Sequence, residues 1–260
     1  MSNENESPLT VEPGLTHHVS RITPVSNESK PPSTLELQAR WDKIRIANLY
    51  DTLDKLGYPD QCLDLAIRPL FPRQHLAGVA VTARGSRDPR TRQDFEAEGG
   101  GPNYFKVLRE TVFPGCVVIV ETGGEPHTGK FGEMTSWGLQ QGGARGLVLD
   151  GCIRDRLGLE VIPNYTVCAR GTSPVESAKR WRIQAVNVPI AMPGTLTSQV
   201  RVNPGDWVVG GPDGVIVVPQ KIAMQALVNA EEIEAREQGM REDLAAGMSF
   251  GDAFAKWGRA

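Results

Sequence analysis

The sequence is poor in the residues that build zinc centres and disulfide frameworks. Its 260 residues include only four cysteines and four histidines. The cysteines form no Cys-x-x-Cys pair and stand mostly inside apolar runs, so we predict that they are reduced core residues. The histidines have no ligand-like spacing, which argues against a zinc site. The eight residues are Cys62, Cys116, Cys152, Cys168, His17, His18, His75 and His127.

Long apolar runs and an excess of basic charge are also missing. No stretch approaches membrane-spanning length, and Met1–Ser7 lacks the basic and apolar regions of a signal peptide, so we expect a cytoplasmic protein. The net charge is −3, and Lys and Arg are scattered without a basic stripe. We therefore expect neither a membrane nor a nucleic acid among the partners.

The composition divides the chain into an arm and a body. Residues 1–32 are rich in Ser, Asn, Glu, Pro and Thr, which predicts a flexible N-terminal arm. Ser33 and Glu36 then form a capping-box pattern that opens a helix expected to run to Gly57. Nothing in the rest suggests a second core, so we expect residues 33–260 to form one domain.

Short β-branched runs between Gly and Pro turns predict strands in this body. These runs are Val79–Ala83, Val117–Val120, Leu147–Leu149, Tyr165–Ala169, Ile183–Val188, Trp207–Val209 and Val215–Val218. A long charged helix is predicted over Gln220–Gly247. The mixture of helices and strands indicates an α/β fold.

A polar insertion occupies residues 86–101, between two predicted elements. A loop of this length inside a compact domain is more often functional or mobile than idle. The alternative is a solvated surface excursion. If the insertion is functional, it could reshape substrate choice or serve an interface.

The run Asp150-Gly-Cys-Ile-Arg-Asp155 ends an apolar, strand-like segment with a cation and two carboxylates. The carboxyl ends of strands in an α/β sheet open onto the ligand crevice, so we expect Arg154 and Asp155 to project into it together. Arg154 can fork onto a carboxylate or an oxyanion, and Asp155 can hold a hard divalent cation. Taken alone, the two could form a surface ion pair, and Asp150 could simply shape a tight turn.

A second carboxylate is expected nearby, at the start of a helix. The run Gly132-Glu133-Met134-Thr135 predicts a helix that continues to about Gln141, and its free first-turn amides can receive an anionic group. Glu133 and Asp155 are 155 − 133 = 22 residues apart, the length of one helix, one turn and one strand. A right-handed βαβ unit would bring them together. The alternative is that Glu133 only complements the helix dipole.

Together these motifs resemble the family that holds the class II 4-hydroxy-4-methyl-2-oxoglutarate and 4-carboxy-4-hydroxy-2-oxoadipate aldolases and the RraA-type regulators of ribonuclease E. The resemblance covers roughly residues 40–257. It rests on Gly132–Asp155, with flanking matches at Tyr50–Gly57, Gly78–Gly85, Pro204–Asp206 and Asp213–Val215. It implies a compact swivelling β/β/α-type sandwich with N- and C-terminal helices. It also implies homotrimers, often paired into homohexamers, with sites between subunits.

The activity implied by the resemblance is retro-aldol cleavage of a 4-hydroxy-2-oxo acid to pyruvate, with decarboxylation of oxaloacetate as a side activity. A Mg²⁺ or Mn²⁺ ion would be held by Asp155 and Glu133, and Arg154 would bind the forming enolate oxygen. The residues expected to bind this small 2-oxo acid are Gly132, Glu133, Met134, Thr135 and Arg154.

The resemblance further implies that a glutamate from a neighbouring subunit's C-terminal region completes the site. Glu237 is our choice, Glu231 and Glu234 remain open, and a solvated helix edge is the alternative. The rival function is that of a regulator that inhibits a ribonuclease through protein contacts. The regulators can keep the Arg154–Asp155 string, so only Glu133 and the acidic helix favour the enzyme.

Overall fold

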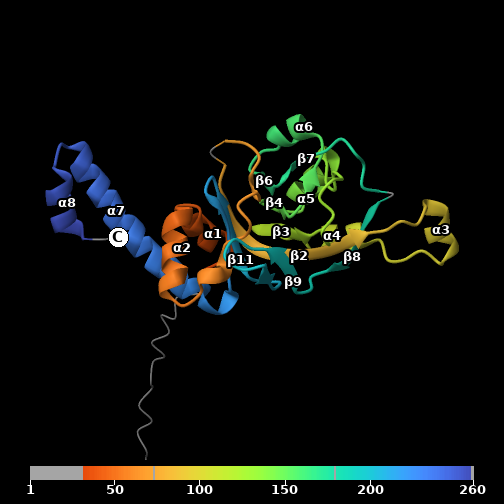
Figure 1. The fold of residues 1–260 in the computed structure, drawn as a ribbon, viewed down its shortest axis with the longest axis horizontal. Helices are drawn as coiled ribbons and strands as arrows, with labels where there is room; N and C mark the ends of the chain where they lie inside the picture. Colours follow the sequence, from red (N-terminus) through yellow and green to blue (C-terminus); the bar gives the residue numbers. More distant parts are fainter. Residues whose placement is uncertain (1–31, 73, 179, 259–260) are drawn as a thin grey trace, which may run out of the picture. The chain divides into compact units, whose positions relative to one another are not determined.

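A computed structural model describes residues 32–72, 74–178 and 180–258, and Figure 1 traces its elements. The predicted arm lies almost wholly outside these residues. The strands of the main, eight-stranded sheet are β1 (Arg68–Pro69), β2 (Leu76–Arg87), β3 (Cys116–Glu121), β4 (Gly146–Leu149), β6 (Thr166–Ala169), β8 (Trp181–Val186), β11 (Trp207–Gly211) and β12 (Gly214–Val218). Each predicted strand matches one of these, and in each at least one end differs by a residue or more.

The main sheet is mixed. Its strand order is β1-β6-β4-β3-β2-β11-β12, and β8 pairs with β2 as well. Strands β2, β3, β4 and β6 run parallel, whereas β1, β8, β11 and β12 pair antiparallel with their neighbours. The end strand β1 also lies beside β11 and β12, so the sheet nearly closes on itself. The parallel strands point their carboxyl ends to one edge, where the chain leaves for the predicted site.

Helices cover the sheet in two groups (Figure 1). The helices α1 (Thr34–Trp41), α2 (Ile46–Lys55) and α7 (Ala223–Ala245) pack on β11 and β12. The helices α4 (Tyr104–Thr111), α5 (Glu133–Gln141) and α6 (Arg156–Glu160) pack on the parallel strands. The predicted α/β class and the helices at both ends of the domain are therefore confirmed.

Alternation along the strands separates the inside of the sheet from its helix-covered outside. In β12, Val215 and Val217 join the inner core, whereas Ile216 and Val218 pack against α1, α2 and α7. The ribbon of β9 (Ile190–Pro193) and β10 (Gln199–Val202) adds Ile190, Met192, Val200 and Val202 to the inner core. The molecule thus has a β ribbon, a sheet and helices as successive layers.

The helix predicted from Ser33 to Gly57 is correct at its start and wrong in its middle. The Ser33–Glu36 capping box is present. The helix ends at Trp41, and Arg45 is extended (φ −70°, ψ 142°) before α2 begins. Trp41, Ile44 and Ile46 are all at most 5 % exposed. Five residues turn a helix by about 500°, so a continuous helix would point Ile46 away from Trp41, and the break lets both face the core.

Two further segments are more ordered than predicted. In the insertion, β2 extends to Arg87 and α3 (Arg92–Ala97) begins with a Thr91–Asp94 capping box. Beyond the predicted C-terminal helix, which α7 confirms, a turn at Gly247 (φ +93°) leads into α8 (Phe250–Trp257). Among the described residues, no helix is both long and apolar enough to span a bilayer.

Candidate active site

The first turn of α5 forms one wall of the predicted site. Gly132 caps the helix, its N–H donates to Thr135 Oγ1 (3.0 Å), and the same hydroxyl donates to the Gly132 carbonyl (2.9 Å). Phe131 is 1 % exposed and anchors this turn in the core. Met134 is 72 % exposed. The first-turn amides have no partner within the helix, so this wall offers N–H donors to an anion.

The opposite wall is the turn after β4. Asp150 is 8 % exposed, and its Oδ1 accepts from the Thr122 N–H (2.7 Å). Asp150 thus ties the turn after β4 to the residue that follows β3. The strand β5 (Cys152–Ile153) pairs with β7 (Gly171–Thr172), and the Arg154 N–H donates to the Phe131 carbonyl (3.0 Å). Arg154 is thereby tied to the segment that leads into α5.

Asp155 turns the chain at the start of α6. Its φ of +58° and ψ of 44° place it in the left-handed region, which Asp tolerates better than most residues. Its Oδ2 lies 3.4 Å from the Glu133 N–H and 3.4 Å from Arg154 Nε. The side chains of Arg154 and Asp155 are 37 % and 44 % exposed, so both are accessible to a ligand.

Two glycines make this approach possible. A Cβ at Gly132 would collide with Asp155 Oδ2 and come within 3.0 Å of Arg154 Cγ. A Cβ at Gly158, on α6, would collide with the Glu133 carboxylate. The structure thus brings the Glu133 amide together with the Arg154 and Asp155 side chains, and it places the Glu133 carboxylate against Gly158 of α6.

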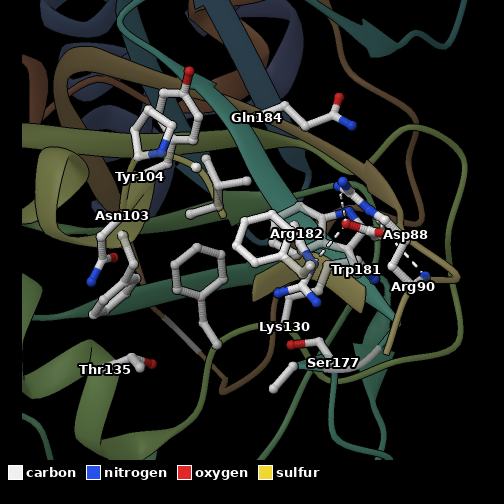
Figure 2. Close-up of a pocket in the computed structure, with 17 residues that line it drawn as sticks. Asp88, Arg90, Asn103, Tyr104, Lys130, Thr135, Ser177, Trp181, Arg182 and Gln184 are labelled. Atoms are coloured by element: carbon white, nitrogen blue, oxygen red, sulfur yellow. Dashed lines mark hydrogen bonds and ion pairs between the residues drawn. The ribbon is translucent and has the colours of Figure 1, made fainter. Parts of the chain in front are cut away.

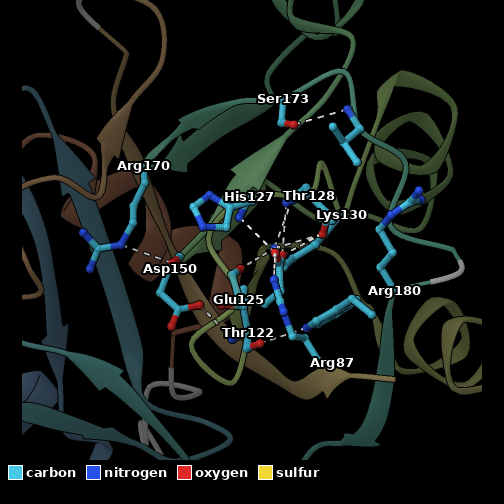
Figure 3. Close-up of polar contacts among 12 residues, drawn as sticks. Arg87, Thr122, Glu125, His127, Thr128, Lys130, Asp150, Arg170, Ser173 and Arg180 are labelled. Atoms are coloured by element: carbon cyan, nitrogen blue, oxygen red, sulfur yellow. Dashed lines mark hydrogen bonds and ion pairs between the residues drawn. The ribbon is translucent and has the colours of Figure 1, made fainter. Parts of the chain in front are cut away.

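A buried ion pair, which sequence reasoning missed, lies beneath the turn (Figure 3). Lys130 Nζ donates to the Glu125 carboxylate (2.7 Å), to the Glu125 carbonyl (2.6 Å) and to the Thr128 carbonyl (3.1 Å). The two side chains are 0 % and 1 % exposed. A Cβ at Gly151 would lie 3.0 Å from Lys130 Nζ. We call Glu125, Thr128 and Lys130 the buried knot, and it backs the turn that carries Arg154.

Hydrogen bonds hold the knot's carboxylate ionised. Burial alone would raise the pKa of Glu125, but donors from Lys130 and Thr128 outweigh it and lower that pKa to about 2. No signal of this arrangement was visible in the sequence, because Glu125 and Lys130 meet only through the fold of their loop.

The C-terminal glutamates lie elsewhere in the same chain. Glu237 accepts from Asn48 Nδ2 (3.0 Å) and Arg241 Nη1 (3.0 Å), and Glu234 accepts from the same two side chains. The Glu231 carboxylate accepts two hydrogen bonds from the Arg40 guanidinium, one from Nε (2.8 Å) and one from Nη2 (2.7 Å). These hydrogen-bond partners lie on α1, α2 and α7, not on α5 or α6.

The donors for a metal ion are few. Within residues 32–72, 74–178 and 180–258, no group of three or more His, Cys, Asp and Glu side chains is arranged to hold a metal ion. The cysteines are free, as predicted. Cys116 and Cys168 are buried, and burial raises the pKa of the Cys116 thiol to about 11. Glu133 and Asp155 remain as the carboxylate pair of the site.

A cavity of about 650 Å³ adjoins the first turn of α5 (Figure 2). It is lined by the insertion, the start of α4, β8, and the side chains of Lys130, Phe131 and Thr135. Aromatic side chains dominate its walls, and they are Phe95, Tyr104, Phe105, Phe131 and Trp181.

The model of the RraA-like family, described as Aldolase/RraA, matches residues 46–217, more than half of the chain. The chain belongs to the RraA-like family. A Halalkalibacterium halodurans protein, provisionally named 4-hydroxy-4-methyl-2-oxoglutarate aldolase, is 28 % identical over 188 residues, 71 % of this chain and 80 % of that protein. A Paraburkholderia phytofirmans protein with the same provisional name is 34 % identical over 169 residues, 62 % of this chain and 90 % of its own length.

Solved structures of RraA-like proteins share the fold. A Streptomyces coelicolor protein, described as an unusual member of the RNase ES inhibitor RraA protein family, superposes with a TM-score of 0.67 at 26 % identity. The match covers 82 % of this chain and 98 % of that one. An uncharacterized Pseudomonas syringae protein has a TM-score of 0.70 at 24 % identity over 88 % of this chain and 99 % of its own.

The RraA-like region leaves out parts of the chain that the structure describes in detail. The helices α7 and α8 follow the matched residues 46–217. The insertion lies inside the matched region and supplies Phe95 to the cavity. Its polar composition gave no sign of this aromatic wall.

Proposed function

We propose that this RraA-like protein is a divalent-metal-dependent aldolase that cleaves a 4-hydroxy-2-oxo acid to pyruvate. The observation that carries the proposal is the convergence of Glu133, Arg154 and Asp155 at the start of α5. The aldolase names of the relatives support it, and they make 4-hydroxy-4-methyl-2-oxoglutarate and 4-carboxy-4-hydroxy-2-oxoadipate the first substrates to assay.

The residues present fit a hard cation such as Mg²⁺ or Mn²⁺. Mg²⁺ usually keeps several waters and is bound through one or two carboxylates together with substrate oxygens. Glu133 and Asp155 supply two carboxylates, which Gly158 and Gly132 leave room for, and the Asp155 side chain is accessible. In this proposal both hold the cation, directly or through water.

The reaction breaks the bond between C3 and C4 of the substrate. The 4-hydroxyl loses its proton, C4 becomes the carbonyl carbon of the second product, and the bonding electrons form the enolate of pyruvate, which then takes a proton at C3. Arg154 donates hydrogen bonds to the developing enolate oxygen. The first-turn amides, at Met134 and Thr135, receive the substrate carboxylate. The bound cation supplies Lewis-acid stabilisation of the same negative charge.

The third carboxylate is proposed to come from a second copy of the chain. Glu237 is our choice, with Glu231 and Glu234 as substitutes, in a homotrimer or homohexamer. This acid would move the proton of the 4-hydroxyl. The swivelling β/β/α arrangement belongs to the same proposal.

Oxaloacetate provides the simplest test, because its decarboxylation forms the same enolate. Purified protein with oxaloacetate and Mg²⁺ should release pyruvate, and addition of a chelator should stop it. Spontaneous decarboxylation is measured in a blank with oxaloacetate and Mg²⁺ but no protein, and it is subtracted. Failure to form pyruvate from oxaloacetate and from both named hydroxy-oxo acids would reject the proposal.

The likeness to the Streptomyces coelicolor protein favours a second candidate, an inhibitor of a ribonuclease. Exposed apolar side chains beside the site, Leu157 (82 % exposed) and Val161 (68 % exposed), suit a protein contact. Inhibition of a purified ribonuclease E without any pyruvate release would favour this candidate over the aldolase.

A further inference from the structure

The cavity beside α5 has an aromatic interior. Trp181 is 5 % exposed, its indole N–H donates to the Thr122 carbonyl (2.9 Å), and the ring is thereby fixed in the wall. Phe131 and Phe105 pack with ring centroids 6.4 Å apart. Figure 2 shows Tyr104 and Gln184 at the rim. Walls of this kind favour a flat, apolar ligand group.

The insertion closes one side of the cavity through Phe95. The guanidinium of Arg182, on β8, lies 4.3 Å from the centroid of the Phe95 ring, and that of Arg90 lies 5.0 Å from it. Asp88 joins the two arginines, accepting from Arg90 (2.8 and 2.9 Å) and from Arg182 (2.7 Å). These contacts fix the aromatic ring of an otherwise polar loop against the sheet.

The cationic side chains that line the cavity are paired with acidic side chains in or beside it. Arg90 and Arg182 face Asp88, and Arg90 also pairs with Glu98 (2.8 Å), so this cluster sums to zero. The hydrogen bonds from Arg90 hold the pKa of Asp88 far below its usual range, so its negative charge persists. Lys130 is matched by Glu125 in the buried knot. Each described cation that lines the cavity, Arg90, Arg182 or Lys130, thus has an acidic partner.

The cavity and the Arg154–Asp155 site share one segment of chain. Thr135 lines the cavity and exchanges hydrogen bonds with Gly132, which contacts Asp155. Phe131 lines it too, and its carbonyl accepts from the Arg154 N–H (3.0 Å). The cavity and the Arg154–Asp155 site therefore adjoin the same turn at the start of α5.

The geometry points to this cavity as the binding site for the C4 substituent of the substrate, and to an uncharged aromatic group as its occupant. The inference rests on the proposed function and narrows it: the cleaved acid is a 4-hydroxy-4-aryl-2-oxobutanoate. Loss of the 4-hydroxyl proton and of the C3–C4 bond gives an aryl aldehyde, and C3 takes a proton to give pyruvate. Atoms and electrons balance without a further reactant.

Binding of two matched acids tests the inference without turnover. 4-Phenyl-2-oxobutanoate and 2-oxoglutarate share the 2-oxo acid end and differ at C4, which bears phenyl in one and carboxylate in the other. Neither has a 4-hydroxyl group, so neither can be cleaved. In calorimetry with Mg²⁺ and the full chain, we expect the phenyl acid to bind about tenfold more tightly or better, as burial of a ring predicts. Equal affinities, tighter binding of 2-oxoglutarate or no binding of the phenyl acid would overturn the inference.

A charge introduced at the rim should reverse the preference. Gln184 lines the cavity on β8, and Gln184→Arg would add a guanidinium without an acidic partner, so the ratio of the two affinities should shift toward 2-oxoglutarate by about tenfold or more. The matched control is Gln199→Arg, on the exposed edge of β10 outside the cavity, which should leave the ratio unchanged. An identical ratio in Gln184→Arg and the control would count against the cavity.

The outcome separates this inference from the proposed function. Pyruvate release from oxaloacetate without preference for the phenyl acid would keep the aldolase and reject the aromatic subsite. Preferential binding of the phenyl acid that responds to Gln184→Arg, without any pyruvate release, would keep the subsite and reject the aldolase.

Discussion

Two acidic groups of this protein lie close together in the fold and have opposite surroundings. In the buried knot, Glu125 and Lys130 are almost fully enclosed, and each is bound by several donors or acceptors of the same loop. At the candidate site, Asp155 is held at 3.4 Å by a single side chain and a single amide, and it is 44 % exposed. The first arrangement is complete within the chain. The second leaves carboxylate oxygens free for a ligand.

The charges of the buried knot support the fold, whereas the exposed charge of Asp155 is available for chemistry. Burying a charge is costly unless it is paired and hydrogen-bonded, so the knot stabilises the fold only while both of its partners remain. The site instead depends on backbone geometry, since Gly132 and Gly158 decide how closely the carboxylates approach. The two regions should therefore respond differently to mutation.

The largest effect is expected on breaking the knot. Lys130→Met leaves the buried Glu125 with only the exposed Arg87 (3.7 Å) as a cation, so the free energy of unfolding should fall by ~3–5 kcal/mol, measured by urea denaturation. The matched control is Lys106→Met, which breaks an exposed pair with Glu110 (69 % and 64 % exposed) and should cost less than ~1 kcal/mol. Similar losses in the two variants would contradict the assignment of the knot as a stabilising core pair.

Acid should reveal the same difference. The pKa of Glu125 is lowered from its usual 4.5 to about 2, so its contribution is fully present above pH 4.5 and is lost as the pH falls toward 2. The contribution is roughly 3 kcal/mol by linkage. The free energy of unfolding of the native chain should therefore fall as the pH is lowered through this window. In Glu125→Gln it should fall less. Identical pH profiles in the two proteins would show that the buried knot does not lower the pKa of Glu125.

The next largest effect is expected on removing the exposed charge of Asp155. Asp155→Asn keeps the size of the side chain and removes its charge, so pyruvate release should fall about 100-fold or more while the free energy of unfolding changes by less than ~1 kcal/mol. Asp213→Asn, in the exposed turn between β11 and β12, is the control and should match the native chain. Near-normal turnover of a folded Asp155→Asn protein would refute its role as a cation anchor.

A smaller change is expected from Arg154→Lys. The charge is kept but the planar fork is lost, so turnover should fall about tenfold while Mg²⁺ affinity, measured by calorimetry, changes less. Arg201→Lys, on the exposed face of β10, serves as the reference substitution. Collapse of Mg²⁺ binding with normal turnover at saturating Mg²⁺ would mean that Arg154 and Asp155 have exchanged roles.

The smallest signal should come from mixing two inactive proteins. If Glu237 completes the site of a neighbouring copy, Asp155→Asn mixed with Glu237→Gln should regain part of the native activity, because some interfaces then hold two intact halves. The knot, complete in one chain, offers no such rescue: Lys130→Met and Glu125→Gln should stay destabilised on mixing. No recovered activity under demonstrated subunit exchange would leave Glu237 in its hydrogen bonds with Asn48 and Arg241.

Local sequence patterns made most of the fold predictable. Short β-branched runs marked β3 and β12, and the capping box marked the start of α1. The break before Arg45 was not predictable from local spacing, because it depends on the shared core of Trp41, Ile44 and Ile46. Tertiary packing thus broke the predicted single helix into two, despite its helical spacing of apolar residues.

The candidate site was predictable where its residues adjoin element ends. Glu133 at a helix start and Asp155 after a strand were brought together as the βαβ argument required. The knot and the Phe95 wall were not predictable, because they depend on how two irregular loops fold back on the sheet. The polar composition of these loops predicts that they are mostly exposed, but it does not predict which of their side chains become buried.

The left-handed backbone of Asp155 has a consequence for how stability and function compete in this protein. Glycine adopts φ +58° without a steric penalty, so on backbone grounds alone glycine suits position 155 better than aspartate does. Any sequence optimised only for stability would drift toward glycine there and lose the carboxylate. Aspartate at position 155 therefore has a small conformational disadvantage. In exchange, its carboxylate lies beside the Glu133 amide and the Arg154 guanidinium.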